Sequence, residues 1–199
     1  MQLKNIDYFK LHLSVLLAGF TGLLGKIISV NEVAIVWYRM VFAFIFFAII
    51  LFFINKKPIE KPINVLKFLG LGILLSVHLM FFFGSIKYSN VSVGAVCYSL
   101  VGFFTVLFEP IILKTKFSYR ELLYSLIAVF GIGLIFNFDI NYRFGIVLGI
   151  ISACLFALYT IFTKIVEINK SARIMLFYEL FGGAVFMSIF LPIYMIFDS

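Results

Sequence analysis

Six ionisable side chains lie inside or at the ends of long apolar stretches of this 199-residue chain. They are Arg39, His78, Glu179, Glu109, Lys26 and Lys164. If these stretches cross a lipid bilayer, a charge at the bilayer centre costs about 2.5–3.5 kcal/mol on insertion scales. Each group therefore needs a partner, a water-filled cavity or a bound solute, and such groups are candidates for binding or gating a polar solute.

Arg39 and His78 lie deepest among the basic groups. At about 1.5 Å per helical residue, Arg39 is roughly 9 Å from the start of its stretch and His78 roughly 18 Å along its own. A guanidinium stays charged, so we expect Arg39 to face a cavity or a gate, with a structural ion pair as the alternative. His78 either hydrogen-bonds a neighbouring helix or, with an unperturbed pKa near ~6.5, serves a proton-coupled step.

The other charged groups lie closer to the ends of their stretches. Lys26 and Lys164 can extend their ammonium groups to the membrane surface. Glu109 can reach the lipid headgroups, or it can pair with one of two nearby lysines, Lys114 and Lys116. We keep all three as substrate-binding or gating candidates.

Glu179 lies roughly 10 Å into the last apolar stretch. Tyr178 stands beside it, as Tyr38 stands beside Arg39. We therefore add both tyrosines to the substrate-binding or gating candidates. Two further tyrosines, Tyr98 and Tyr159, are placed to line the same path.

Several kinds of chemistry are excluded by what the sequence lacks. His12 and His78 are its two histidines, and neither an HExxH nor a GxSxG motif occurs, so we expect no enzyme. Cys97 and Cys154 lie in apolar stretches without a CxxC or Cys/His spacing, so we expect no metal, no cofactor and no disulfide. The formal charge of +7 does not indicate nucleic-acid binding, because the basic residues are dispersed over short segments between apolar stretches.

The apolar stretches themselves predict an all-α polytopic membrane protein. The chain is 64% hydrophobic with a mean hydropathy of +1.16, whereas soluble domains are about 45–50% apolar. Seven stretches approach the ~20 residues that cross a bilayer. They are 9–27, 33–54, 66–87, 91–113, 120–138, 144–165 and 172–197.

The basic residues predict the orientation of these seven crossings. With the N-terminus inside, twelve lie on the inner side: Lys4, Lys10, Lys56, Lys57, Lys61, Lys67, Lys114, Lys116, Arg120, Lys164, Lys170 and Arg173. Three lie on the outer side: Lys26, Lys87 and Arg143. By the positive-inside rule the N-terminus is cytoplasmic, and the expected location is the cytoplasmic (inner) membrane.

Local signals mark the joints. Ser89-Asn90 is the whole predicted link between the third and fourth stretches. The linker between the second and third stretches is Asn55–Pro62, and its two prolines are expected to keep it non-helical. Pro110 is expected to kink or break the fourth stretch near its inner end. Gly145 and Gly149 form a small-xxx-small pair of the kind that lets helices approach.

Two segments repeat a common pattern, Gly22–Phe44 and Ala157–Gly183. Each ends one apolar stretch on a lysine, crosses a short polar loop and opens the next stretch with an aromatic pair and a charge. An offset of five crossings makes the copies inverted, a plan common among secondary transporters. The repeat places Arg39 and Glu179 at matching positions, so we expect each to guard one entrance of a central cavity.

A family resemblance is carried by four segments, FFFGSIKYSNVSVGAV, YSLVGFFTVLFEPIILKTKFS, RELLYSLIAVFGIGLIF and WYRMVFAF. Segment 66–136 resembles the EamA-type module of the drug/metabolite transporter superfamily, whose members usually have ten helices in two inverted halves and move small metabolites, often outward. The family often has a Pro midway along the fourth helix and a Glu just past its end. Here Val101-Gly102 and Thr115 stand near those places and Glu109-Pro110 appears instead, so roles tied to the usual residues do not carry over.

The resemblance implies a secondary transporter, an exporter or exchanger of a small organic metabolite that works by alternating access. It divides the chain into a five-helix unit, 1–138, and the first two helices of an inverted second unit, 139–199. Three further helices are expected beyond Ser199, so the alternative is a non-transporting membrane subunit that needs a partner. The expected partners are a small solute and the lipid bilayer, with proton or ion coupling and a homodimer as further options, and no nucleic acid.

Overall fold

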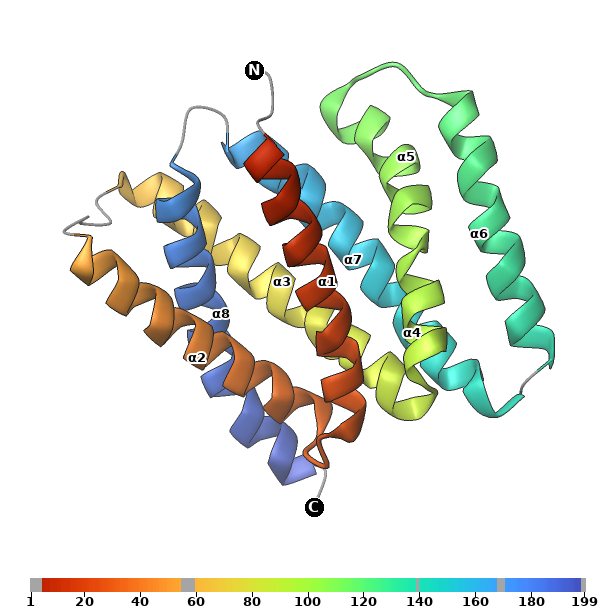
Figure 1. Cartoon of the computed structure of the whole chain (residues 1–199), viewed down its shortest axis with the longest axis horizontal. Helices are drawn as coiled ribbons and strands as arrows, with labels where there is room; N and C mark the ends of the chain where they lie inside the picture. Colours follow the sequence, from red (N-terminus) through yellow and green to blue (C-terminus); the bar gives the residue numbers. More distant parts are fainter. Residues whose placement is uncertain (1–4, 55–59, 139, 168–170, 198–199) are drawn as a thin grey trace.

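Helices joined by short links make up the described structure, a computed structural model that covers residues 5–54, 60–138, 140–167 and 171–197 (Figure 1). In chain order they are α1 (Asn5–Ile27), α2 (Glu32–Phe53), α3 (Pro62–Tyr88), α4 (Val91–Tyr98), α5 (Leu100–Leu113), α6 (Tyr119–Phe138), a 3-10 turn (Ile140–Tyr142), α7 (Arg143–Glu167) and α8 (Ala172–Phe197). No strand occurs within these ranges. The prediction of an all-α membrane protein is confirmed.

Six of the helical segments are long and apolar enough to cross a membrane. They are Tyr8–Ile27, Glu32–Phe53, Pro62–Tyr88, Val91–Leu113, Ile140–Glu167 and Ala172–Ile196. The predicted stretch 120–138 forms α6, which is not among the six. Figure 1 shows α6 beside α5 and running in the opposite direction. Because α6 is not among the six candidate spans, the seventh crossing stays a prediction.

The helices alternate in direction (Figure 1). The first residues of α1, α3, α6 and α8 and the last residues of α2, α5 and α7 lie along one edge, called the upper edge below. Asparagine caps hold two of the joints at the opposite, lower edge: the Asn31 side chain accepts from the Ala34 N–H at 2.7 Å, and Asn90 accepts from Val93 at 2.8 Å. The predicted two-residue link Ser89-Asn90 is confirmed.

Helix α3 is the centre of the packing and contacts α1, α2, α4, α7 and α8. Its crossing with α8 is close enough to exclude side chains, because a Cβ on Gly72 would lie 2.0 Å from the Glu179 carbonyl oxygen. The predicted small pair on α7 also works this way. A Cβ on Gly145 would meet Ser89 and one on Gly149 would meet Cys97, at 2.7 and 2.6 Å.

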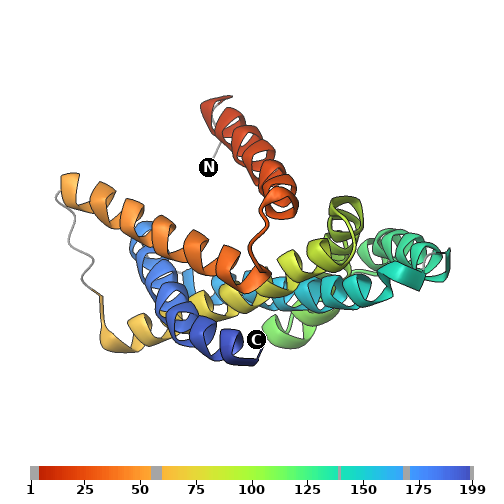
Figure 2. The same cartoon turned by 90° about the horizontal axis from the view of Figure 1, so that it is seen from below.

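Helix α1 stands away from the layer that the other helices form (Figure 2). Its contacts lie toward its C-terminal end, where a Cβ on Gly25 would lie 2.4 Å from the Phe83 ring. Gly22 similarly faces Ile86 and Val91. Because α1 leans away from the layer, space remains beneath it.

Two details of the fourth and third stretches differ from the predictions. The fourth is interrupted at Ser99 and not at Pro110, which remains inside α5. Both the N–H and the hydroxyl of Ser99 donate to the Val96 carbonyl, at 3.1 and 2.6 Å, and this tight turn competes with the helical ladder. The third helix begins at Pro62, earlier than predicted, because proline fits the first helical position.

Some predictions fall on residues that the structure does not describe. These are the inner-side positions Lys4, Lys56, Lys57 and Lys170 and most of the linker Asn55–Pro62.

Candidate functional site

The largest described cavity lies beneath α1 and has a volume of about 540 Å³; we call it the central cavity. Helices α1, α2, α3, α4, α7 and α8 all contribute to its wall. The lining is mostly apolar, and its polar side chains are Thr21, Arg39, His78 and Tyr98. A volume of this size and a lining with few polar groups are typical of a small-molecule site.

Arg39 lies in the third turn of α2 and is exposed to two cavities. One is the central cavity; the other, called the side cavity, has about 340 Å³ and lies between Arg39, Tyr38 and the end of α1. Within the described residues Arg39 makes no ion pair. The predicted alternative, a structural ion pair, is not seen there.

His78 lies in the wall of the central cavity and is 3% exposed. Its Nδ1 is 2.9 Å from the Ser152 carbonyl oxygen and 3.0 Å from the Ser152 hydroxyl. Since a carbonyl oxygen only accepts, Nδ1 carries the hydrogen, and Nε2 of the neutral ring is an acceptor. His78 therefore joins α3 to α7, as expected, and keeps one nitrogen for another partner.

Aromatic rings surround His78. The ring centroids of Phe156, Tyr98 and Phe82 lie 4.6, 6.1 and 6.2 Å from the His78 centroid, and all three residues line the central cavity. The cavity thus has an aromatic wall next to a cationic group, in which the Phe82 and Tyr98 rings meet edge to face with 68° between their planes. Such a wall suits a planar or apolar solute body.

Glu179 lies outside the lining of the central cavity, although its neighbour Leu180 is part of that lining. Its side chain is buried, and its Oε2 accepts a hydrogen bond from the Tyr159 hydroxyl at 3.2 Å. Tyr178 stacks on Phe68 with a centroid distance of 6.3 Å and lines none of the three cavities described here.

Tyr38 lies on the far side of Arg39 from the central cavity. It is 48% exposed, lines the side cavity and stacks on Phe42 with a centroid distance of 5.9 Å. The structure therefore brings Arg39 and Tyr38 to one cavity and Arg39 and His78 to another.

Lys26 binds backbone carbonyls at the end of α3, and its predicted reach to the membrane surface stays a prediction. Its Nζ donates to the carbonyl oxygens of Ile86, Lys87 and Ser89 at 3.1, 3.2 and 3.0 Å. These carbonyls end α3, where a cation is favoured by the helix dipole. Lys26 thus fastens the end of α1 to the end of α3.

Glu109 pairs with Lys164, at 2.5 Å between Oε1 and Nζ, and not with either of the two lysines that the sequence suggested. This pair joins α5 to α7 near the upper edge. Because Lys164 is 64% exposed in its side chain, the pair contributes little to stability. Neither residue lines the central cavity.

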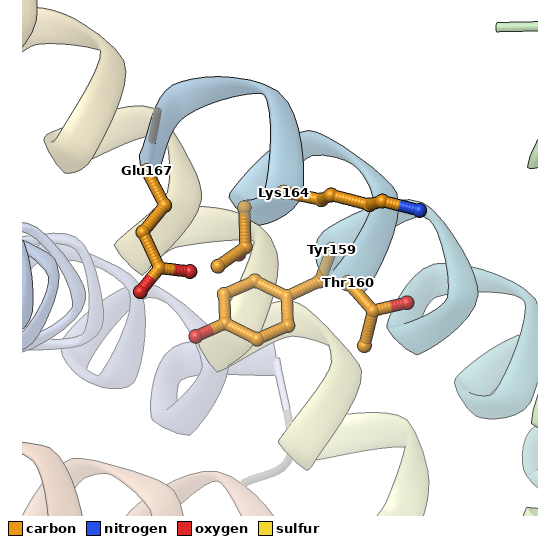
Figure 3. Close-up of a pocket in the computed structure, with 5 residues that line it drawn as sticks. Tyr159, Thr160, Lys164 and Glu167 are labelled. Atoms are coloured by element: carbon orange, nitrogen blue, oxygen red, sulfur yellow. The ribbon is translucent and has the colours of Figure 1, made fainter. Parts of the chain in front are cut away.

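A third cavity, of about 410 Å³, lies at the end of α7 and is called the α7-end cavity (Figure 3). It is lined by Tyr159, Thr160, Thr163, Lys164 and Glu167. Figure 3 shows the Tyr159 hydroxyl and the Glu167 carboxylate on one side of it and the Lys164 ammonium on the other. Tyr159 touches both this cavity and Glu179, so it connects the two.

Sequence reasoning missed Phe82, Phe156 and Ser152. Ser152, Phe156 and Tyr159 follow one another at helical spacing on one face of α7, which is the face that meets His78 and Glu179. That spacing was the available signal. Among 27 phenylalanines it could not single out two.

One comparison with known proteins gives a match. The model of the EamA-like transporter family matches residues 6–137. This segment runs from the second residue of α1 almost to the end of α6, and it contains Arg39, His78 and Tyr98. No curated protein and no solved structure matches the chain.

Proposed function

Because this chain belongs to the EamA-like transporter family, we propose that it is a secondary transporter of a small organic anion that binds in the central cavity. The observation that carries the proposal is Arg39, a permanently charged group that faces an otherwise mostly apolar cavity and has no ion pair among the described residues. A guanidinium offers two parallel hydrogen bonds to a carboxylate or a phosphate.

The rest of the lining indicates what such an anion would carry. Phe82, Tyr98 and Phe156 provide a largely apolar aromatic wall, and Nε2 of His78 can accept a hydrogen bond from an amine or a hydroxyl. The favoured solute is an anionic or zwitterionic metabolite with a planar or apolar body. Its size is bounded by the cavity volume of about 540 Å³.

Alternating access requires one part of the protein to move against another. Helix α1 supplies part of the central cavity wall, yet it stands away from the other helices except toward its C-terminal end (Figure 2). We propose that α1 moves against α3 as the cavity changes its access. The chain then works as an exporter or exchanger driven by a solute or ion gradient, since its sequence holds no ATP-binding motif.

We propose the cytoplasmic (inner) membrane as the location, with the N-terminus in the cytoplasm. Of the described basic residues, eight lie at or near the upper edge: Lys10, Lys61, Lys67, Lys114, Lys116, Arg120, Lys164 and Arg173. Lys26, Lys87 and Arg143 lie toward the opposite edge. This bias supports an inner upper edge by the positive-inside rule.

Ligand-dependent thermal stabilisation of the purified chain tests the proposal. The probes are aromatic and aliphatic carboxylates and phosphates, each paired with its uncharged methyl ester. We expect at least one anion to raise the melting temperature of the wild type, its ester not to do so, and Arg39→Ala to abolish the effect. Esters that stabilise as well as acids, or an unchanged response of Arg39→Ala, would overturn the anion site.

A further inference from the structure

Glu179 is enclosed without the partners that an ionised carboxylate needs. The residue is 2% exposed, and its Oε2 accepts one hydrogen bond, from the neutral Tyr159 hydroxyl. Its Oε1 is buried and has no hydrogen-bond partner among the described residues. In the same residues no basic group lies within ion-pair distance of it.

The helices around Glu179 do not neutralise it either. Helix α3 presents Gly72, whose missing side chain lets the two backbones touch. Helix α7 presents Tyr159 and Glu167, and the second is a like charge. The basic groups of α2 and α3, which are Arg39, Lys67, His78 and Lys87, make no ion pair with Glu179. An ionised carboxylate would be costly here, so these surroundings favour the neutral carboxyl group.

A route for protons leads to this carboxyl group from the end of α7. The α7-end cavity is lined by the exposed Lys164 and by Tyr159, whose hydroxyl donates a hydrogen bond to Glu179 (Figure 3). The Thr163 Oγ1, one turn from Tyr159 on the same face of α7, is buried with no hydrogen-bond partner in the described structure. Unsatisfied polar atoms beside a cavity of this size favour ordered water.

We propose that Glu179 is a proton-binding site of this protein, loaded from the upper edge through the α7-end cavity. A hydronium ion in the cavity transfers its proton to the Tyr159 hydroxyl oxygen while that hydroxyl passes its own proton to Oε2 of the ionised Glu179, which leaves a neutral carboxyl group, an intact tyrosine and a water molecule. The reverse step releases the proton. The inference deepens the proposed function and rests on it in one respect: it makes transport proton-coupled.

A proton fits this site better than a metal cation does. A metal ion needs several oxygen ligands at once. Among the residues that the structure describes, no group of three or more His, Cys, Asp or Glu side chains could hold one. Glu179 offers one free oxygen, which is what a proton requires.

Infrared spectroscopy of the full chain in liposomes, followed through a pH titration, tests the proposal without any solute. A protonated carboxyl group has a C=O stretch that an ionised one lacks. We expect Glu179→Gln to remove one such band and Glu109→Gln, whose carboxylate is already paired with Lys164, to leave it. The proton site can thus fail while the anion site holds, or the reverse, because the readout involves no transport.

Tyr159→Phe supplies a second, independent measurement. It removes the hydrogen bond that favours the ionised form, so the midpoint of the band should move to higher pH by about one unit. A band that survives Glu179→Gln would overturn the proposal. So would a band that sodium ions abolish at constant pH, which would indicate a cation site. If Glu179→Gln does not fold, an unmoved midpoint in Tyr159→Phe overturns it.

Discussion

Arg39 and Lys164 carry the same charge but meet different surroundings. Lys164 is paired with Glu109 on the outer surface of the bundle, and Lys26 is bonded to three carbonyl oxygens. Arg39 faces two cavities without an ion pair among the described residues. Because of these surroundings we propose that Arg39, and not Lys26 or Lys164, binds the solute.

We predict that Arg39→Lys binds the anions that stabilise the wild type about tenfold more weakly, and Arg39→Ala about 10- to 100-fold more weakly. Lysine keeps the charge but loses the two-pronged hydrogen bond, and alanine loses both. Isothermal titration with the strongest carboxylate or phosphate measures the affinities. Full affinity in Arg39→Lys would show that charge alone matters, and Lys10→Met is the control for lost charge elsewhere on the chain.

For single residues, the sequence was enough to predict how deep each charged side chain lies in its apolar stretch, but not which side chain it pairs with. The position of Arg39 within an apolar stretch was enough to predict a group that faces a cavity. The predicted ion-pair partners of Glu109 were wrong, because its actual partner Lys164 lies 55 residues away in the sequence and only the fold brings the two together. The aromatic wall around His78 was missed for the same reason.

The crossing of α3 and α8 determines where Glu179 lies. Backbone contact at Gly72 is possible because that residue has no side chain, and Gly182 meets Leu69 in the same way, at 2.8 Å from an ideal Cβ. Close approach of this kind gives helices in lipid most of their packing energy. It also encloses the Glu179 side chain between α3 and α7.

We predict that Gly72→Ala lowers the free energy of unfolding by about 1–3 kcal/mol, because the new Cβ would lie 2.0 Å from the Glu179 carbonyl oxygen. Gly70→Ala is the matched control, since a Cβ there meets nothing within 4 Å. It should be neutral or slightly stabilising, as expected for alanine in a helix. Thermal or denaturant melts in detergent measure both. Equal melts for the two variants would show that the crossing is looser than described.

Element positions were largely predictable, and their interruptions were not. The apolar stretches gave the long helices, since hydropathy and length suffice in a membrane. The break at Ser99 depends on a side-chain hydrogen bond to Val96 that competes with the helical ladder, and no composition signal separates it from Ser125, which lies within α6.

On the scale of the whole molecule, α1 and α7 run in opposite directions, as do α2 and α8 (Figure 1). Inverted copies related by an axis in the membrane plane would have this arrangement. It supports the proposal that 1–138 and 139–199 are a five-helix unit and part of an inverted one. The two copies are inverted in the membrane only if α6 also crosses it, because an even number of crossings between the copies would give both the same orientation.

We predict that α6 crosses and that the upper edge is cytoplasmic. In a Cys97→Ser/Cys154→Ser background, Lys116→Cys and Arg143→Cys place single thiols before and after α6. An impermeant thiol reagent applied to intact cells should label position 143 and not position 116. Labelling of both would mean that α6 does not cross, and labelling of position 116 alone would reverse the orientation.

Counterflow in proteoliposomes tests the central claim, that this chain moves an organic anion through the cavity at Arg39. Vesicles are loaded with the anion that most stabilises the wild type, and uptake of a labelled trace is measured. The account predicts uptake by the wild type, none by Arg39→Ala, and an unchanged melting temperature of Arg39→Ala without the anion. Wild-type uptake in Arg39→Ala, or no uptake by a folded wild type, would contradict it.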